Sequence, residues 1–271
     1  MNFLSLERPF GSDYSGYQYS GSSFLLLLQY WLPVALGWSV AMVIKRADGG
    51  AFSHSGLTLL LAGIGAAYSF DRIVDHSGWT PRWVRRSLIT ALTLCAGTIS
   101  FLILSGRITS DSLRVIAVLT GVSLIYPRIK RLPLAKTAAV VLCWTWACST
   151  LPQAGGCRHW FTLDVTLPLT LVVTSGCILC DLKDIAEDRR QHVGSLPAIL
   201  GIRPSCLVTT FLSLIAATLA IFHHRFGLAV GALLMAIAAQ FPSLLKRNPT
   251  GPILIDSILL VPGILIATGI V

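Results

Sequence analysis

The most informative deficit of this sequence is in charge. Only 12% of its 271 residues are Asp, Glu, Lys or Arg, compared with roughly 25% in soluble globular domains. Acidic residues are the scarcest charged class, with 12 Asp and Glu against 21 Lys and Arg. This composition excludes an ordinary soluble domain, and a hydrophobic content of 54% favours a protein that lies in lipid.

The chain also lacks a long polar segment after residue 22, which argues against a second domain. Its apolar runs approach the roughly 20 residues needed to cross a bilayer core about 30 Å thick. We predict nine transmembrane spans, at about 23–44, 55–76, 87–105, 112–126, 134–151, 164–182, 204–222, 226–242 and 252–271. Residues 1–22 are expected to form a polar N-terminal arm, and residues 23–271 a single transmembrane domain.

A disulfide framework and a zinc site are not indicated. Seven cysteines lie mainly in or beside apolar runs. Cys177 and Cys180 form a C-x-x-C pair, but no second pair or nearby His completes a four-ligand set. We interpret these cysteines as packing residues.

The basic residues predict the orientation of the chain in the membrane. Fifteen of the 21 Lys and Arg fall on the face that holds the N-terminus and the connections after even-numbered spans. Short loops rich in Lys and Arg face the cytoplasm. The net charge of +9 is explained in this way without a nucleic-acid partner.

Similar segments recur along the chain. Asp71 and Asp181 open acidic segments 110 residues apart, and Tyr126-Pro and Phe241-Pro follow the fourth and eighth spans 115 residues apart. These offsets predict an all-α membrane fold of two four-helix pseudo-repeats plus a ninth helix, arranged around a central cavity.

Half of the acidic residues gather in two short segments. Asp71 and Asp75 are spaced i,i+4, and Asp181, Asp184 and Asp188 are spaced i,i+3 and i,i+7, so each set is expected on one helical face. Like charges held so close repel each other, and such an arrangement is normally retained because a cation binds between them. Their all-oxygen ligand set suits Mg²⁺, so all five aspartates are candidate metal ligands and catalytic residues.

Magnesium held by a few carboxylates usually shares its coordination with substrate phosphates. Basic residues accompany both acidic segments and the end of the fourth span, where they could bind phosphate oxygens. The candidate diphosphate-binding residues are Arg72, Lys130, Arg131 and Lys183.

The motifs resemble those of the UbiA superfamily of intramembrane prenyltransferases. The segment from Asp181 to Arg189, followed by Gly194-Ser-Leu-Pro197, resembles the second aspartate-rich motif of that family, and the segment from Tyr126 to Arg131 resembles its Tyr-x-x-x-Lys-Arg motif. The first motif departs from the family pattern Asn-Asp-x-x-Asp-x-x-x-Asp. Only Asp71 and Asp75 match it.

The resemblance implies that Mg²⁺ and the basic residues help a prenyl diphosphate to ionise to an allylic cation in a lipid-embedded cavity. Aromatic faces could stabilise that cation. The candidates for prenyl or cation contact are Tyr68, Tyr126, Trp144 and Trp146. Asp256 lies in the ninth span, where an ionisable group is costly, and is a candidate for the acceptor site.

The leading hypothesis is a Mg²⁺-dependent prenyltransferase that moves a polyprenyl group to an aromatic or other lipophilic acceptor. A UbiA-type terpene cyclase, in which the cation is quenched within the same molecule, is an alternative. A transporter or a catalytically inactive relative are further alternatives. The sequence leaves the acceptor, the prenyl chain length and the oligomeric state open.

Overall fold

The structure is a computed structural model that describes residues 23–49, 53–75, 82–152, 164–247 and 249–270. The predicted arm at 1–22 lies outside the described residues. All regular elements in the described part are helices, so the predicted all-α class is confirmed there. The helices are α1 (Ser23–Asp48), α2 (His54–Asp75), α3 (Arg82–Leu104), α4 (Ser110–Ile129), α5 (Ala135–Thr150), α6 (Thr166–Cys180), the 3₁₀ turn η1 (Asp181–Lys183), α7 (Ile185–Arg190), α8 (Leu196–Leu200), α9 (Ile202–Phe222), α10 (Phe226–Ala238), α11 (Pro242–Leu245) and α12 (Thr250–Ala267).

Each predicted span coincides with one of the long helices, and four of these helices are long and apolar enough to cross a membrane. The four are α3, α6 with η1, α9 and α12. They make the chain a multi-pass membrane protein by length and composition. The full count of nine transmembrane spans and the two pseudo-repeats stay predictions.

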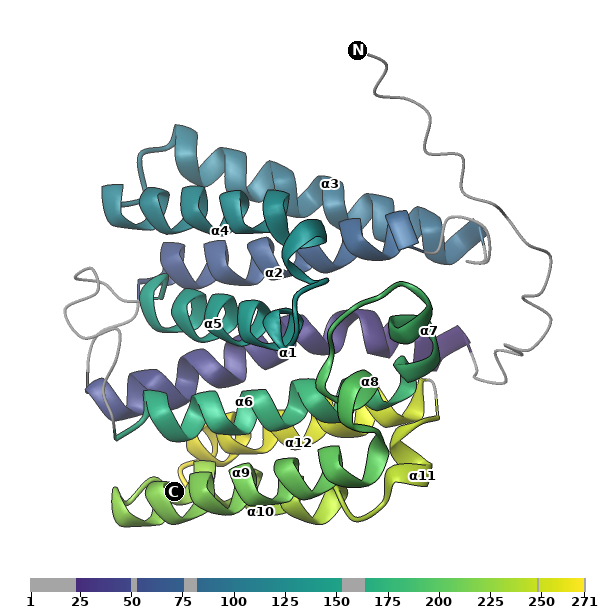
Figure 1. The fold of residues 1–271 in the computed structure, drawn as a ribbon. Helices are drawn as coiled ribbons and strands as arrows, with labels where there is room; N and C mark the ends of the chain where they lie inside the picture. The colour runs from purple at the N-terminus through teal and green to yellow at the C-terminus, as the bar shows by residue number, and fades with distance from the viewer. Residues whose placement is uncertain (1–22, 50–52, 76–81, 153–163, 248, 271) are drawn as a thin grey trace.

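The long helices lie side by side and alternate in direction (Figure 1). Helix α2 packs on α1 and α3, α5 packs on α4 and α6, and α9 packs on α6 and α10. Helix α12 packs on α10 and returns to α1, so the last long helix closes against the first. Burial differs along this arrangement: 61% of the apolar window of α6 is buried, against 17% of that of α3. Helix α6 is therefore central, and α3 presents its apolar surface outward.

The seam between α1 and α12 depends on one buried hydroxyl. Pro262 lies inside α12 and supplies no backbone N–H to the helix. Next to it, the N–H of Gly263 donates to Ser39 Oγ of α1 at 3.1 Å, and this hydroxyl donates to the carbonyl of Leu259 at 3.0 Å. Ser39 is thus inserted into the hydrogen-bond ladder of α12. A Cβ at position 263 would lie 2.4 Å from Ser39 Oγ, so the close approach requires glycine there.

The alternating directions bring several predicted motifs to one end of the bundle. This end, which we call the aspartate end, is formed by the C-terminal ends of α2, α4 and α6 and the N-terminal ends of α5 and α9. Helices α7 and α8 lie there as well, on the right in Figure 1. The motifs come from distant parts of the sequence, so their proximity follows from helix packing.

Candidate active site

The centre of the candidate site is a lysine held between two buried aspartates. Lys136 Nζ, from the first turn of α5, lies 2.9 Å from Asp181 Oδ1 and 3.0 Å from Asp188 Oδ2. It also donates to Asp188 Oδ1 at 3.2 Å. The side chains of Asp181 and Asp188 are only 12% and 8% exposed. We call this arrangement the Lys136 bridge.

The backbone at the end of α6 explains how the two aspartates meet. The α-helix stops at Cys180, and the chain continues through η1, in which the N–H of Asp184 donates to the carbonyl of Asp181 at 3.0 Å. Helix α7 follows, and the N–H of Asp188 donates to the carbonyl of Asp184 at 2.7 Å. The sequence predicted one helical face for all three residues. The structure instead places them on a tightened turn and a new short helix.

Asp184 is held differently from its two neighbours. Its carboxylate accepts from Lys183 Nζ at 2.9 Å and is 38% exposed, although it remains within electrostatic range of Asp181. Glu187 pairs with Arg190 on α7, and its side chain is 37% exposed. The acidic segment therefore divides into a buried pair, Asp181 and Asp188, and two partly exposed residues, Asp184 and Glu187, each paired with a basic residue of its own segment.

The connection between α4 and α5 is joined to the segment after α7 by two backbone hydrogen bonds. The N–H of Gly194 donates to the carbonyl of Lys130 at 3.2 Å, and the N–H of Leu134 donates to the carbonyl of Gly194 at 2.7 Å. A Cβ on Gly194 would lie 2.6 Å from the carbonyl oxygen of Leu132 and 2.8 Å from Pro133 Cα. Glycine at 194 therefore permits the contact that brings the predicted Tyr126–Arg131 motif beside the second acidic segment.

The other predicted cations lie around this junction. Lys130 is half-buried and Arg131 is exposed. Lys183 is engaged with Asp184, as described above. The structure thus gathers Lys130, Arg131 and Lys183 at the aspartate end.

The first acidic segment forms the last two turns of α2. Asp71, Arg72 and Asp75 belong to this helix, but their side chains lie outside the described residues. Three residues earlier, the ring of Tyr68 meets that of Trp144 of α5 edge to face, with centroids 6.3 Å apart. This contact places the end of α2 beside α5, whose first turn carries Lys136.

The remaining aromatic candidates are more dispersed. Trp144 and Trp146 are half-buried and pack against the main hydrophobic core. Tyr126 is half-buried in the last turn of α4. Among the four predicted prenyl-contacting residues, Tyr68 and Trp144 contact each other.

Asp256 lies in the second turn of α12, near the second acidic segment. It is within electrostatic range of Cys177 and Cys180 on α6, and Asp181 interacts with the same two cysteines. At about 1.5 Å per residue, its position in α12 is about 9 Å from the start of the helix. Asp256 thus lies near the second acidic segment, about two turns of α12 further into the bundle than the aspartate end.

The carboxylate oxygens at the Lys136 bridge are suitable ligands for a cation. The carboxylates of Asp181 and Asp188 already hold an ammonium group at hydrogen-bonding distance, and carboxylate oxygens suit Mg²⁺. Among the residues that the structure describes, no three His, Cys, Asp or Glu side chains form a group that could hold a metal by themselves. A divalent ion here would take one or two aspartates and complete its coordination with substrate phosphates and water.

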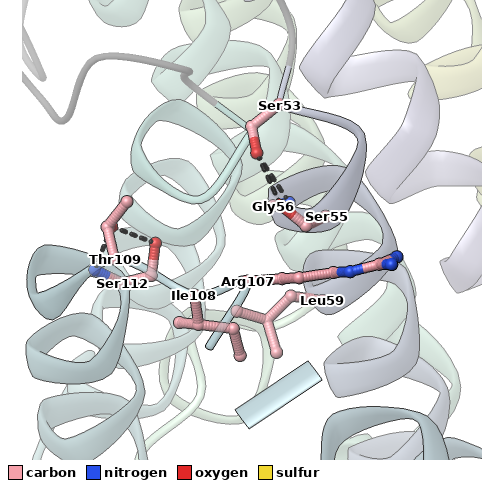
Figure 2. A pocket seen from close by; sticks show the side chains of 8 residues that line it. All are labelled: Ser53, Ser55, Gly56, Leu59, Arg107, Ile108, Thr109 and Ser112. Atoms are coloured by element: carbon pink, nitrogen blue, oxygen red, sulfur yellow. Dashed lines mark hydrogen bonds between the residues drawn. The ribbon is translucent and has the colours of Figure 1, made fainter. Parts of the chain in front are cut away.

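A small pocket lies at the other end of the bundle and is separate from this site. Ser53, Gly56 and Leu59, at the start of α2, meet Arg107 of the α3–α4 connection and Ser112 of α4 around it (Figure 2). Its volume is about 10 Å³, which is about the room that one water occupies. The hydroxyls of Ser53 and Thr109 are used as helix caps. We assign no substrate to this pocket.

Sequence reasoning missed the role of Lys136. It counted this residue only as one of the basic residues that orient the chain. No local pattern marks it, because its partners lie 45 and 52 residues away. A weak signal was available: Lys136 opens an apolar helix that otherwise carries no charge.

Fold and site together define a multi-pass all-α bundle with an acidic and basic site at one end. The structure is similar to the apo structure of a UbiA homolog from Aeropyrum pernix K1, with a TM-score of 0.60, 17% identity, and coverage of 91% of this chain and 97% of the other. It is also similar to a UbiA homolog from Archaeoglobus fulgidus bound to DMAPP and Mg²⁺, with a TM-score of 0.55, 16% identity, and coverage of 91% and 99%. No family model and no curated protein matches the sequence. The resemblance read from the motifs is confirmed at the level of the fold.

Proposed function

We propose that this chain is a member of the UbiA superfamily and a Mg²⁺-dependent intramembrane prenyltransferase, acting on an allylic prenyl diphosphate and an aromatic or other lipophilic acceptor. The observation that carries the proposal is the pair of buried carboxylates, Asp181 and Asp188, which hold a cation at the aspartate end of a UbiA-like bundle. The fold neighbour bound to DMAPP and Mg²⁺ supports the same substrate class and metal.

The residues have distinct parts in this proposal. Asp71, Asp75, Asp181, Asp184 and Asp188 are the proposed metal ligands. When bound, Mg²⁺ neutralises charge on the leaving diphosphate. Arg72, Lys130, Arg131 and Lys183 are proposed to bind non-bridging phosphate oxygens, as ammonium and guanidinium groups do.

The proposed reaction is a substitution at the allylic carbon of the prenyl group. The bond between this carbon and the diphosphate oxygen breaks, and both electrons leave with the diphosphate. The acceptor then forms a bond to the carbon and loses one proton to a base. The rings of Tyr68 and Trp144, which meet edge to face, are proposed to lie beside the allylic cation, where aromatic faces attract positive charge. Asp256 is proposed to contact the acceptor.

Release of inorganic diphosphate tests this function directly. The purified protein in lipid is given prenyl diphosphates of several chain lengths and a panel of aromatic acceptors, with Mg²⁺ or with a chelator. We expect diphosphate release that requires Mg²⁺ and a prenylated acceptor among the products. A cyclic hydrocarbon or terpene alcohol formed from the diphosphate alone would replace the transferase with the cyclase alternative. No release under any of these conditions would refute both enzymes and leave the inactive relative or the transporter.

A further inference from the structure

The Lys136 bridge joins two charges that are both unfavourably placed on their own helices. Lys136 lies in the first turn of α5, where the helix dipole disfavours a cation, and Asp181 lies just past the last residue of α6, where the dipole disfavours an anion. Both are largely removed from water, with side chains 19% and 12% exposed. Each therefore depends on the other for compensation.

The bridge also changes the charge that a divalent ion would meet. Asp181, Asp184 and Asp188 carry three negative charges, and Lys136 and Lys183 carry two positive charges at 2.9 to 3.0 Å from them. The local net charge is −1, whereas the aspartates alone would give −3. Both Asp188 oxygens and one Asp181 oxygen already accept hydrogen bonds or ion-pair contacts from the ammonium. A divalent ion on these atoms would lie beside the ammonium of Lys136 and would compete with it for the same negative charge.

We propose that Lys136 is a built-in cation that competes with Mg²⁺ for Asp181 and Asp188. In the absence of diphosphate the ammonium holds the two carboxylates and keeps the affinity for Mg²⁺ low. Its role in turnover rests on the proposed function: an arriving diphosphate offers oxygen acceptors equivalent to those of the carboxylates, and the flexible lysine stem allows the ammonium to move to them. Lys136 is thereby a positioning residue that couples metal binding to the arrival of the anionic substrate.

Thermal unfolding of the full chain in lipid, followed as a function of MgCl₂ without any diphosphate, measures this competition without using activity. We expect Lys136→Gln to unfold at a lower temperature than wild type in chelator, because the two carboxylates lose their cation. We expect Mg²⁺ to restore the lost thermal stability. The Mg²⁺ concentration at the midpoint of this stabilisation should be at least about tenfold lower than for wild type, and a tenfold change corresponds to 1.4 kcal/mol. Lys136→Arg keeps the charge and should respond as wild type does.

Lys183→Gln is the matched control, because it removes the same charge from the same cluster but leaves the Lys136 bridge intact. Its Mg²⁺ midpoint should move less than that of Lys136→Gln. NaCl at equal ionic strength should not reproduce the stabilisation by Mg²⁺, since screening acts on all exposed charges. Equal midpoints for wild type and Lys136→Gln, or an equal shift in Lys183→Gln, would overturn the proposal.

Wild type provides a test that does not require a folded variant. The proposal requires Mg²⁺ alone to stabilise wild type only weakly. Added inorganic diphosphate should lower the midpoint when it is expressed as the concentration of free Mg²⁺. Strong stabilisation of wild type by micromolar Mg²⁺ alone would refute it. The prenyltransferase proposal can fail separately. If the Mg²⁺ midpoints differ between variants as expected but no prenyl substrate releases diphosphate, the enzyme proposal is refuted. The proposal that Lys136 competes with Mg²⁺ then still stands.

Discussion

At the scale of the residue, burial separates acidic groups that look alike in the sequence. Asp181 and Asp188 are buried and share one ammonium, whereas Asp184 and Glu187 are partly exposed and pair with Lys183 and Arg190. A buried carboxylate is retained only when its charge is compensated, because breaking such a pair costs about 3–5 kcal/mol. The buried pair is therefore the part of the acidic segment most sensitive to substitution.

The first prediction follows from this difference. Asp181→Asn should lower Mg²⁺-dependent diphosphate release by at least about 100-fold, as loss of a group that stabilises transition-state charge does. Glu187→Gln is the control in the same segment and should keep the wild-type rate. The comparison is made on protein purified in lipid at matched concentrations. Equal rates for Asp181→Asn and wild type would contradict the metal-site assignment.

At the scale of the element, the site depends on how two connections are joined. The segment after α7 hydrogen-bonds to the connection before α5, and Gly194 has backbone atoms of Leu132 and Pro133 within 3 Å of the position of a Cβ. Backbone atoms cannot move aside as the end of a flexible side chain can. This junction fixes the start of α5, and with it Lys136, relative to η1 and α7.

We therefore expect Gly194→Ala to displace the junction, to lower the free energy of unfolding by about 1–3 kcal/mol as overpacking does, and to reduce diphosphate release. Gly97→Ala is the matched control, because nothing beyond the neighbouring backbone of α3 itself lies within 4 Å of a Cβ at this helical position. It should be neutral or stabilising by about 0.5–1 kcal/mol. Thermal unfolding and diphosphate release are measured for both variants. A Gly194→Ala protein as stable and active as Gly97→Ala would contradict the role of the junction.

The seam between α1 and α12 supports a second prediction at this scale. Ser39→Ala removes the hydroxyl that accepts from Gly263 and donates to Leu259, leaving both backbone groups without that partner. Interhelical hydrogen bonds in membranes contribute about 0.6 kcal/mol on average and up to about 1.7, so we expect a loss of about 1 kcal/mol in unfolding measurements. Ser257→Ala, which removes an exposed hydroxyl bonded within α12, should change stability by less than about 0.5 kcal/mol. Equal effects would show that the inserted hydroxyl does not stabilise the seam.

At the scale of the whole molecule, charge asymmetry and helix direction act together. The connections at the aspartate end carry most of the basic residues, and the alternating helices bring these connections to one end (Figure 1). The positive-inside rule predicts that this end faces the cytoplasm. The proposed substrate would then approach from the cytoplasmic side.

Single-cysteine labelling tests this orientation. Cysteine placed at Arg247, on the aspartate end, should react with a membrane-impermeant maleimide only when the reagent reaches the cytoplasmic face. Cysteine placed at Arg107, at the opposite end, should react from the other face. Both positions are exposed, and the native cysteines supply the background. Reaction of both positions from one face would contradict the alternating transmembrane arrangement.

The sequence by itself determined the helices, their apolar character and the identity of the acidic and basic motifs. These properties are local: a run of about 20 apolar residues favours a lipid-embedded helix, because every backbone polar group must be bonded within it. The positions of the long helices, the acidic segments at helix ends and the UbiA-like fold were accordingly predictable. The turn at η1 was not, because the i,i+3 and i,i+7 spacing of Asp181, Asp184 and Asp188 fits a continuous helix equally well.

Only the tertiary structure decided which charges meet. Lys136 reaches Asp181 and Asp188 because α5 and α6 pack antiparallel and Gly194 permits the adjoining connections to touch. Tyr68 meets Trp144 because the packing of the bundle brings α2 and α5 within reach of each other. Each of these contacts joins residues more than 40 positions apart, and ion-pair and aromatic interactions act over only a few ångströms. Helix packing, rather than any local pattern, therefore determines whether such residues form a site.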